Sequence, residues 1–450
     1  MQSTICALAS GQGGAVALVR LSGPRALDLL KSLTHKDGAF APRQQVFCTI
    51  YDGGNILDKA LVTYFQAPHS FTGEDVVEFA VHGSSYITGR LLELLCQAGA
   101  TPAQRGEFSQ RAFLNGKMDL VEAQGLCDLI AAGNKSAHQL AMHSLDGKLS
   151  ARLNEMKTKL AELLAQIEVR LDDVDEEMQP LSPDFIRQEI SAVLTHIQTL
   201  TDTFSVGRLI KDGLKVAIVG APNSGKSSLL NALVGFDRAI VTDICGTTRD
   251  TVEETLEVNG QKIILTDTAG IRAHALDVAE QEGMRRSLRA MEQADVILFV
   301  LDAARPLSAE EKQLWNDIEK AHKRTLVILN KCDKPGAVST VDLPHIADYK
   351  QLSVSCKKNI GLDEIKTILT APMNNAPTDG LMLSNLRHYE ALLRAQTELE
   401  STLIRLKNHA GGEIQAEHLR GALKYLKDLL GEITPDDILG IIFSKFCMGK

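Results

Sequence analysis

The stretch GAPNSGKSS occupies residues 220–228, between the apolar run KVAIV and the helix-like LLNALVG. A glycine-rich loop between a strand and a helix is the context that a phosphate-binding loop requires, because its backbone N–H groups and the helix N-terminus can both face phosphates. In such a loop Lys226 neutralises the β and γ phosphates, and Ser227 binds magnesium. The loop predicts a nucleotide-binding α/β fold, but alone it does not separate an ATPase from a GTPase.

Two later motifs make that distinction. DTAG, which begins at Asp267, ends a strand-like run and places this carboxylate near magnesium and the Gly270 amide near the γ-phosphate. NKCD ends at Asp333, whose carboxylate can accept from both N1–H and the exocyclic amine of guanine. A site built for such donors rejects an analogue without them by up to about 10⁴ to 10⁵. With SVSCK at 353–357 placed to meet the guanine O6, the sequence predicts GTP.

The sequence does not show directly which residue orients the attacking water. Ras-like enzymes follow DTAG with a glutamine that orients water, whereas this chain has Ile271. That function must therefore come from elsewhere. TDICGTTRD at 242–250 predicts a switch segment, in which Thr248 is the preferred magnesium ligand and Thr247 the alternative. Two arginines are candidates for a finger on transition-state charge, Arg249 and Arg272.

The predicted GTP site combines the loop, the switch segment and the three later motifs. Its residues are Asn223, Ser224, Gly225, Lys226, Ser227, Ser228, Thr242, Asp243, Ile244, Cys245, Gly246, Thr247, Thr248, Asp267, Thr268, Ala269, Gly270, Asn330, Lys331, Asp333, Ser355, Cys356 and Lys357.

Sequence periodicity predicts a multidomain architecture. Short apolar runs (KVAIVG, KIILTD, DVILFVLD, TLVILN, KQLSVS) alternate with helical stretches, which indicates a mostly parallel sheet covered by helices. Apolar residues spaced by three or four predict long helices on both sides of it, at 149–171, 182–200, 385–406 and 415–430. We therefore expect an N-terminal α+β domain (1–118), a discontinuous helical domain (119–211 and 375–450) and an inserted P-loop GTPase domain (212–374). Two separate helical tails are the alternative.

Composition narrows the class of protein further. The 450 residues include 48 Lys and Arg against 57 Asp and Glu, a net charge of -9, so no overall basic field recruits a polyanion. No apolar run approaches the roughly 20 residues of a membrane span, and MQSTICALAS lacks the basic start of a secretory signal, so a cytoplasmic location is expected. The 8 cysteines include no CxxC pair, which favours reduced thiols over zinc binding.

Beyond the nucleotide motifs, the chain contains RAFLNGKMDL, SFTGEDVVE and a terminal FCMGK. Together these residues closely resemble the MnmE (TrmE) family of tRNA modification GTPases, over essentially the whole chain. The resemblance implies a GTPase that works with the FAD protein MnmG (GidA), as a heterotetramer or larger complex. Its product would be an aminomethyl or carboxymethylaminomethyl group on C5 of the tRNA wobble uridine, position 34. It also implies a constitutive homodimer through a folate-binding N-terminal domain, with 5-formyltetrahydrofolate or methylenetetrahydrofolate as the one-carbon source.

The resemblance also assigns site residues. The folate contacts match Arg20, Glu78, Lys117 and Lys450. In this family Mg²⁺ is joined by K⁺, which replaces the arginine finger when GTPase domains meet; its ligands match Asn223, the Thr242 and Ile244 carbonyls, and Thr247. The water-orienting residue matches Glu280, with Glu282 as the neighbour to exclude.

The tail FSKFCMGK places Cys447 four residues from the end, where a prenyl group can be attached. Prenylation requires aliphatic residues after the cysteine, but Met448, Gly449 and Lys450 follow here. We therefore expect the tail to reach the folate pocket, with Cys447 either a catalytic nucleophile or a non-catalytic thiol. Two other readings remain to be tested, a regulatory GTPase of the ribosome-assembly type and a membrane-tethered small GTPase.

Overall fold

The structure is a computed structural model of the 450-residue chain. It describes residues 3–11, 13–36, 39–172, 179, 181–235, 253–267, 288–374, 380–408, 412–446 and 449. The chain forms two compact units, each made of several segments. The first comprises residues 1–127, 144–193 and 394–450, and the second comprises residues 128–143 and 194–393.

The first unit begins with a mixed sheet of order β3-β4-β5-β2-β1-β6. Its strands are β1 (Ile5–Leu8), β2 (Val16–Ser22), β3 (Gln45–Asp52), β4 (Asn55–Phe65), β5 (Val76–His82) and β6 (Thr101–Pro102). Helices α1 (Ala26–Thr34) and α2 (Ser85–Gln97) bury their apolar side chains with those of one sheet face, among them Val19, Leu21 and Phe79. Side chains alternate along a strand, so Arg20 and Glu78 belong to the opposite face. The expected α+β character of the N-terminal region is confirmed.

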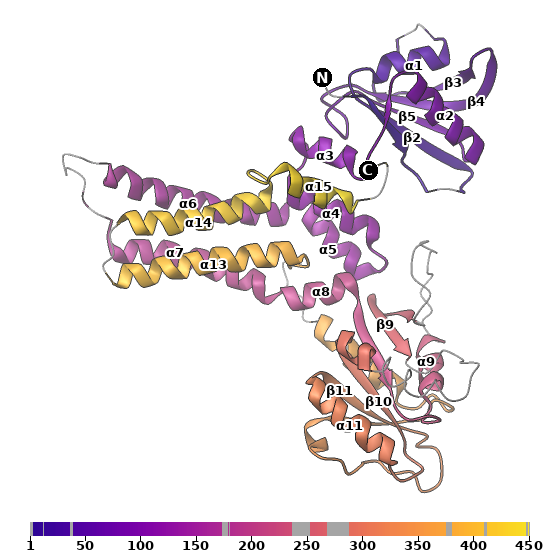
Figure 1. The fold of residues 1–450 in the computed structure, drawn as a ribbon, viewed down its shortest axis with the longest axis vertical. Helices are drawn as coiled ribbons and strands as arrows, with labels where there is room; N and C mark the ends of the chain where they lie inside the picture. Colours follow the sequence, from indigo (N-terminus) through magenta and orange to yellow (C-terminus); the bar gives the residue numbers. More distant parts are fainter. Residues whose placement is uncertain are drawn as a thin grey trace. The chain divides into compact units, whose positions relative to one another are not determined.

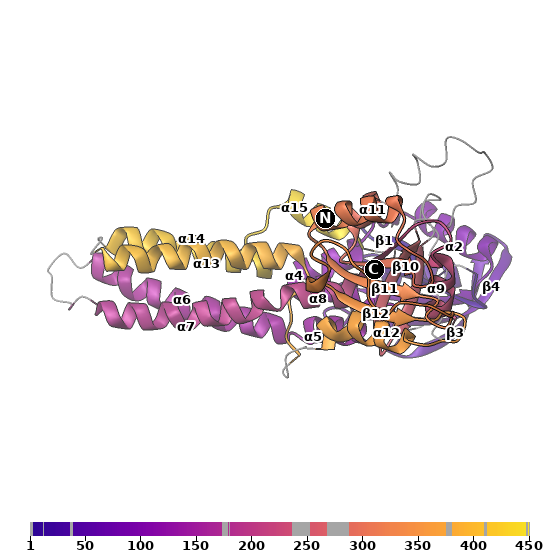
Figure 2. The same ribbon diagram turned by 90° about the horizontal axis from the view of Figure 1, so that it is seen from below.

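Helices make up the rest of the first unit. They include α3 (Glu107–Leu114), most of α4 (Leu120–Ala131), α6 (Lys148–Leu171), α14 (Gly412–Leu430) and α15 (Asp436–Ser444). Helices α6 and α14 lie side by side in both views (Figures 1 and 2), although the whole second sheet lies between them in sequence. Arg420 Nη2 of α14 lies 2.7 Å from Glu168 Oε1 of α6. The apolar positions that predicted α6, such as Leu153, Met156 and Leu160, are buried.

The second unit contains a six-stranded sheet of order β12-β11-β10-β7-β9-β8. Its strands are β7 (Leu214–Val219), β8 (Glu253–Val258), β9 (Gln261–Asp267), β10 (Val296–Asp302), β11 (Arg324–Asn330) and β12 (Lys350–Val354). All neighbouring pairs are parallel except β8 with β9, which form a hairpin. This confirms the predicted, mostly parallel sheet. Because parallel strands end at one edge, the carboxyl ends of β7, β9, β10, β11 and β12 lie along that edge.

Helices of the second unit support this sheet. They include α5 (Lys135–Leu145, of which residues 135–143 belong here), α8 (Phe204–Asp212), α9 (Lys226–Val234), α11 (Ala309–Ala321) and α12 (Leu362–Thr370). Helix α11 begins with a capping box, in which Ser308 Oγ accepts from Glu311 N at 3.2 Å and the Glu311 carboxylate accepts from Ser308 N at 2.9 Å. The reciprocal bonds satisfy backbone donors that a helix start otherwise leaves without partners.

The long helices α7 (Pro183–Asp202) and α13 (Leu386–Lys407) each contribute residues to both units. Both occur where the apolar periodicity predicts them. The boundaries at residues 118, 211 and 374 remain predictions. In the part of the chain that the structure describes, no helix combines the length and apolarity needed to cross a bilayer.

Candidate nucleotide and N-terminal sites

The phosphate-binding loop connects β7 to α9, as its sequence predicts. Lys226 begins α9, and its Nζ donates to the carbonyls of Gly220 and Ala221, both at 2.9 Å. A Cβ at Gly220 would lie 2.3 Å from the Val300 carbonyl oxygen, so only glycine fits where the loop crosses β10. The lysine ammonium is therefore held against the loop that is expected to bind phosphate.

Asn330, at the end of β11, joins this loop to the motif that is expected to bind guanine. Its Nδ2 donates to the Ser224 carbonyl at 3.1 Å. Gly225 has φ +102, and a Cβ there would lie 2.1 Å from the same Nδ2. Glycine is thus needed both for the left-handed backbone and for the close approach. The first residue of NKCD therefore joins the base-binding motif to the phosphate loop.

Asp333 is held in place by Ser355. The buried Ser355 Oγ donates to Asp333 Oδ1 at 2.7 Å and accepts from Lys358 N at 3.2 Å. The Ser355 hydrogen bond holds the pKa of the Asp333 carboxyl below its usual range, and Lys358 and Lys357 act in the same direction. A carboxylate that stays ionised and oriented can accept the paired donors of guanine.

Lys331 joins three parts of this edge. Its Nζ donates to the Asn223 carbonyl at 2.8 Å and to Asp302 Oδ2 at 2.6 Å. Burial raises the pKa of Asp302, but the hydrogen bonds from Lys331 and from the Ala304 backbone outweigh it and leave the pKa lowered. The sequence reasoning missed Asp302, although its position at the end of the apolar run VILFVLD was a signal that could have found it.

The structure describes only some of the residues predicted to bind magnesium or to form the switch segment. Register pairs Asp267, the last residue of β9, with Ile218 of β7, two residues before the phosphate loop. Ser227 lies in the first turn of α9. The Asp267 side chain lies outside the described residues, as do Thr242, Asp243, Ile244, Cys245, Gly246, Thr247, Thr248, Thr268, Ala269, Gly270 and Glu280.

Arg20 and Glu78 form the centre of the N-terminal site. They are directly paired across β2 and β5, and Arg20 Nε and Nη2 donate to Glu78 Oε1 at 2.9 and 2.8 Å. The guanidinium also lies 5.2 Å from the ring centre of Phe71 and 5.8 Å from that of Phe108. Sequence reasoning identified both charged residues but neither their pairing nor the aromatic rings.

The C-terminal tail reaches this pair. Arg20 Nη1 donates to the Gly449 carbonyl at 3.4 Å. Gly449 has φ +87, and a Cβ there would lie 2.3 Å from the Leu8 carbonyl oxygen. The tail backbone therefore packs closely against the end of β1. Cys447 and Lys450 lie outside the described residues.

Lys117 lies beside the loop that carries Phe71. A Cβ at Gly73 would lie 3.4 Å from Lys117 Cγ and Cδ, and Asn115 Nδ2 donates to the Thr72 carbonyl at 2.6 Å. Lys117 itself is exposed. The SFTGEDVVE and LNGK motifs therefore meet in the structure.

Two protein-family models together match most of the chain. Residues 120–447 match the family described as "MnmE helical domain", and residues 4–117 match "GTP-binding protein TrmE N-terminus". Over 454 residues the chain is 41% identical to the tRNA modification GTPase MnmE of Acinetobacter baylyi, covering 100% of this chain and 97% of that protein. It is 40% identical over 455 residues to the tRNA modification GTPase MnmE of Aquifex aeolicus, with 100% of both covered.

A solved structure is also similar to part of the chain. The G domain of the T. maritima FeoB iron transporter is 25% identical and covers 35% of this chain and 98% of that one, with a TM-score of 0.28. At that TM-score the likeness carries no argument about this chain.

Proposed function

The chain belongs to the MnmE family of tRNA modification GTPases, and from that premise we propose that its GTP hydrolysis drives the modification of C5 of the tRNA wobble uridine. In this proposal the one-carbon unit comes from 5-formyltetrahydrofolate or methylenetetrahydrofolate. The partner is the FAD-dependent protein MnmG, and the chain acts as a cytoplasmic homodimer. The observation that carries the proposal is the contact between the tail carbonyl of Gly449 and the Arg20–Glu78 pair.

In this proposal, side chains of this protein bind GTP and orient the attacking water. Asp333, oriented by Ser355, selects guanine, and Lys226 neutralises phosphate charge. Asn330 holds the base-binding and phosphate-binding motifs in fixed register. Glu280 is the proposed water-orienting residue, which Ile271 cannot replace.

Two cations are proposed for the same edge. Mg²⁺ would be held by Ser227 and Thr248, and K⁺ by Asn223, Thr242, Ile244 and Thr247, all of which offer the oxygen ligands that hard cations prefer. The Asn223 side chain is exposed on the loop at φ +62, which is compatible with an added ligand. When bound, the monovalent ion supplies positive charge toward the β and γ phosphates.

The N-terminal site suits a folate in its donor and acceptor chemistry. A glutamate tail calls for cations, which Arg20, Lys117 and Lys450 can offer, and a pterin presents a donor edge that the Glu78 carboxylate can accept. Phe71 and Phe108 add flat apolar surface beside Arg20. Cys447 would come near the one-carbon unit through the same tail.

Calorimetry with 5-formyltetrahydrofolate tests the proposed binding of folate at the N-terminal site. Glu78→Gln should weaken binding by roughly tenfold or more, since a buried donor left without its acceptor costs about 1–3 kcal/mol. The control is Arg90→Met, which breaks another arginine–carboxylate ion pair, with Asp52 at 2.8 Å, elsewhere in this domain. No binding by the wild-type protein would instead favour a regulatory GTPase without modification chemistry.

Three further experiments test the rest of the proposal. GTP hydrolysis should be faster in potassium than in sodium, and equal rates would exclude the potassium role. Co-elution with MnmG would support the modification pathway, and intact mass would reveal a prenyl group if the tail were an anchor.

A further inference from the structure

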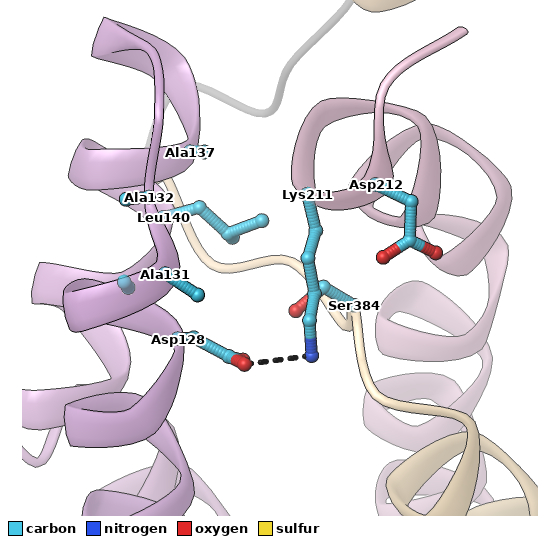
Figure 3. Close-up of a pocket in the computed structure, with 9 residues that line it drawn as sticks. Asp128, Ala131, Ala132, Ala137, Leu140, Lys211, Asp212 and Ser384 are labelled. Atoms are coloured by element: carbon cyan, nitrogen blue, oxygen red, sulfur yellow. Dashed lines mark ion pairs between the residues drawn. The ribbon is translucent and has the colours of Figure 1, made fainter. Parts of the chain in front are cut away.

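Helix α5 packs against the nucleotide-binding part of the second unit at several points. Leu140 is buried in the same apolar cluster as Leu214 and Val258. His143 Nδ1 lies 2.8 Å from the Gly380 carbonyl oxygen. Just before α5, Asp128 forms an ion pair with Lys211 at 2.8 Å, beside a cavity of about 110 Å³ (Figure 3). The segment 128–143 therefore packs with the second sheet and the elements next to it.

The first turn of α5 contacts the tip of the β8–β9 hairpin. Ser136 N donates to the Gly260 carbonyl at 3.2 Å. Gly260 has φ +79, and a Cβ there would lie 3.4 Å from Lys135 Cβ. The backbone hydrogen bond therefore holds the hairpin tip in van der Waals contact with the first turn of α5.

The same hairpin carries catalytic motifs at its other end. Strand β8 begins at Glu253, shortly after the predicted switch segment 242–250, and β9 ends at Asp267, the first residue of DTAG. The two strands are paired along their full length, from Val258 with Gln261 to Glu253 with Thr266. One hydrogen-bonded ladder thus connects the tip of the hairpin to the strand ends beside both motifs.

Two buried polar atoms beside this contact have no hydrogen-bond partner among the described residues. They are Nδ2 of Asn134, a donor, and Oε1 of Gln261, an acceptor. The residues are 8% and 6% exposed, and they flank the two ends of the Ser136–Gly260 hydrogen bond. Asn134 Oδ1 already accepts from Ala137 N at 2.9 Å, which fixes Nδ2 as the free end of the amide. Buried polar atoms are nearly always paired, so a complementary pair left open on the two sides of one contact requires an explanation.

We propose that the α5–hairpin contact has two hydrogen-bonded arrangements, and that Asn134 and Gln261 are positioning residues for GTP hydrolysis. In the arrangement described here, Ser136 N bonds Gly260. In the second, a small displacement of the hairpin lets Asn134 Nδ2 donate to Gln261 Oε1. Neither residue touches the nucleotide; they act through β8 and β9, and the second arrangement accompanies the hydrolytic step.

Gln261→Met and Asn134→Ser in the full-length chain test this proposal. Methionine removes the amide oxygen at nearly equal volume, and serine keeps a helix-capping oxygen while removing the amide donor. Each variant should lower kcat about fivefold with KM unchanged, the size expected for one neutral hydrogen bond formed only in the reacting state. Gln261→Met should keep or raise the melting temperature, since the acceptor it removes is otherwise unpaired.

The double variant and a control complete the test. Combining both substitutions should lower kcat no further than either alone, because they remove the same bond. Gln396→Met removes a side-chain amide from α13, whose Nε2 donates to Glu400, and should leave kcat unchanged. Wild-type kcat in Gln261→Met, or a loss of kcat matched by a lower melting temperature, overturns the proposal.

A reversible cross-link gives an independent measurement. The 3.4 Å Cβ separation of positions 135 and 260 is close to the disulfide range, so Lys135→Cys with Gly260→Cys should lock the described arrangement. Hydrolysis should be lost on oxidation and recovered on reduction, while GTP binding and both single-cysteine variants remain unaffected by the same treatment. Full activity of the oxidised protein would show that the contact does not move.

Discussion

Replacing Gly449 by alanine should release the C-terminal tail from the N-terminal sheet. The glycine backbone has φ +87, and an added Cβ would lie 2.3 Å from the Leu8 carbonyl oxygen and 2.7 Å from Ala9 Cα. An alanine in the left-handed region costs about 1–2 kcal/mol, which alone lowers the docked fraction of tails relative to free tails by about five- to thirtyfold. The contact with backbone atoms increases this effect, because backbone cannot move aside as a flexible side chain can.

Release of the last residue by a basic-residue carboxypeptidase measures this change. Cleavage tracks the population of free tail when opening and closing are fast, so its initial rate should rise at least fivefold in Gly449→Ala. The control is Gly53→Ala, which has φ +61 in the same domain but no atom within 4 Å of the added Cβ. That variant should digest at the wild-type rate. If Gly449→Ala also did so, the close packing of the tail on β1 would be wrong.

The nucleotide edge gives four further predictions. Ser355→Ala should weaken GTP and GDP binding about tenfold without improving ATP binding, as fluorescent nucleotide titration would show, since Asp333 loses its orienting donor. Because the pKa of Asp333 is lowered, guanine binding should persist until the pH falls through that lowered value; in Ser355→Ala the loss should begin at higher pH, and identical profiles would exclude the Ser355 effect. Lys331→Met should lower the free energy of unfolding by roughly 2 kcal/mol in urea titration, because Asp302 is left buried without its cation. Since the lowered pKa of Asp302 adds stability that is lost as pH falls through it, the difference between Lys331→Met and wild type should shrink in acid.

Local signals in the sequence predicted which segments lie at this edge of the second sheet. The phosphate loop, the ends of β9 and β11 and the base-binding motif each have a recognisable short sequence, and the parallel topology brings them to one edge. Their mutual bonds could not be predicted in this way. The bond of Asn330 to Ser224 spans 106 residues and depends on how closely β7 and β11 approach through β10.

In the N-terminal site, too, the contacts between residues far apart in sequence could not be predicted. Arg20 and Glu78 are 58 residues apart, and their pairing depends on the register of β2 against β5, because a shift of one residue would turn one of them to the opposite face. The role of α5 was also beyond the sequence. Residues 135–145 were not among the predicted helices, and their sequence does not show that Leu140 joins the core of the second sheet.

The pairing of α6 with α14 has a consequence for synthesis of the chain. Residues 214–370, which supply every strand of the second sheet, leave the ribosome before α14 exists. The apolar side chains of α6 that are buried in the structure, including Leu153 and Leu160, therefore stay exposed to water or bind a chaperone until α14 has been synthesised. The second sheet, which carries the proposed nucleotide site, can thus be synthesised completely before α14 is available to pair with α6.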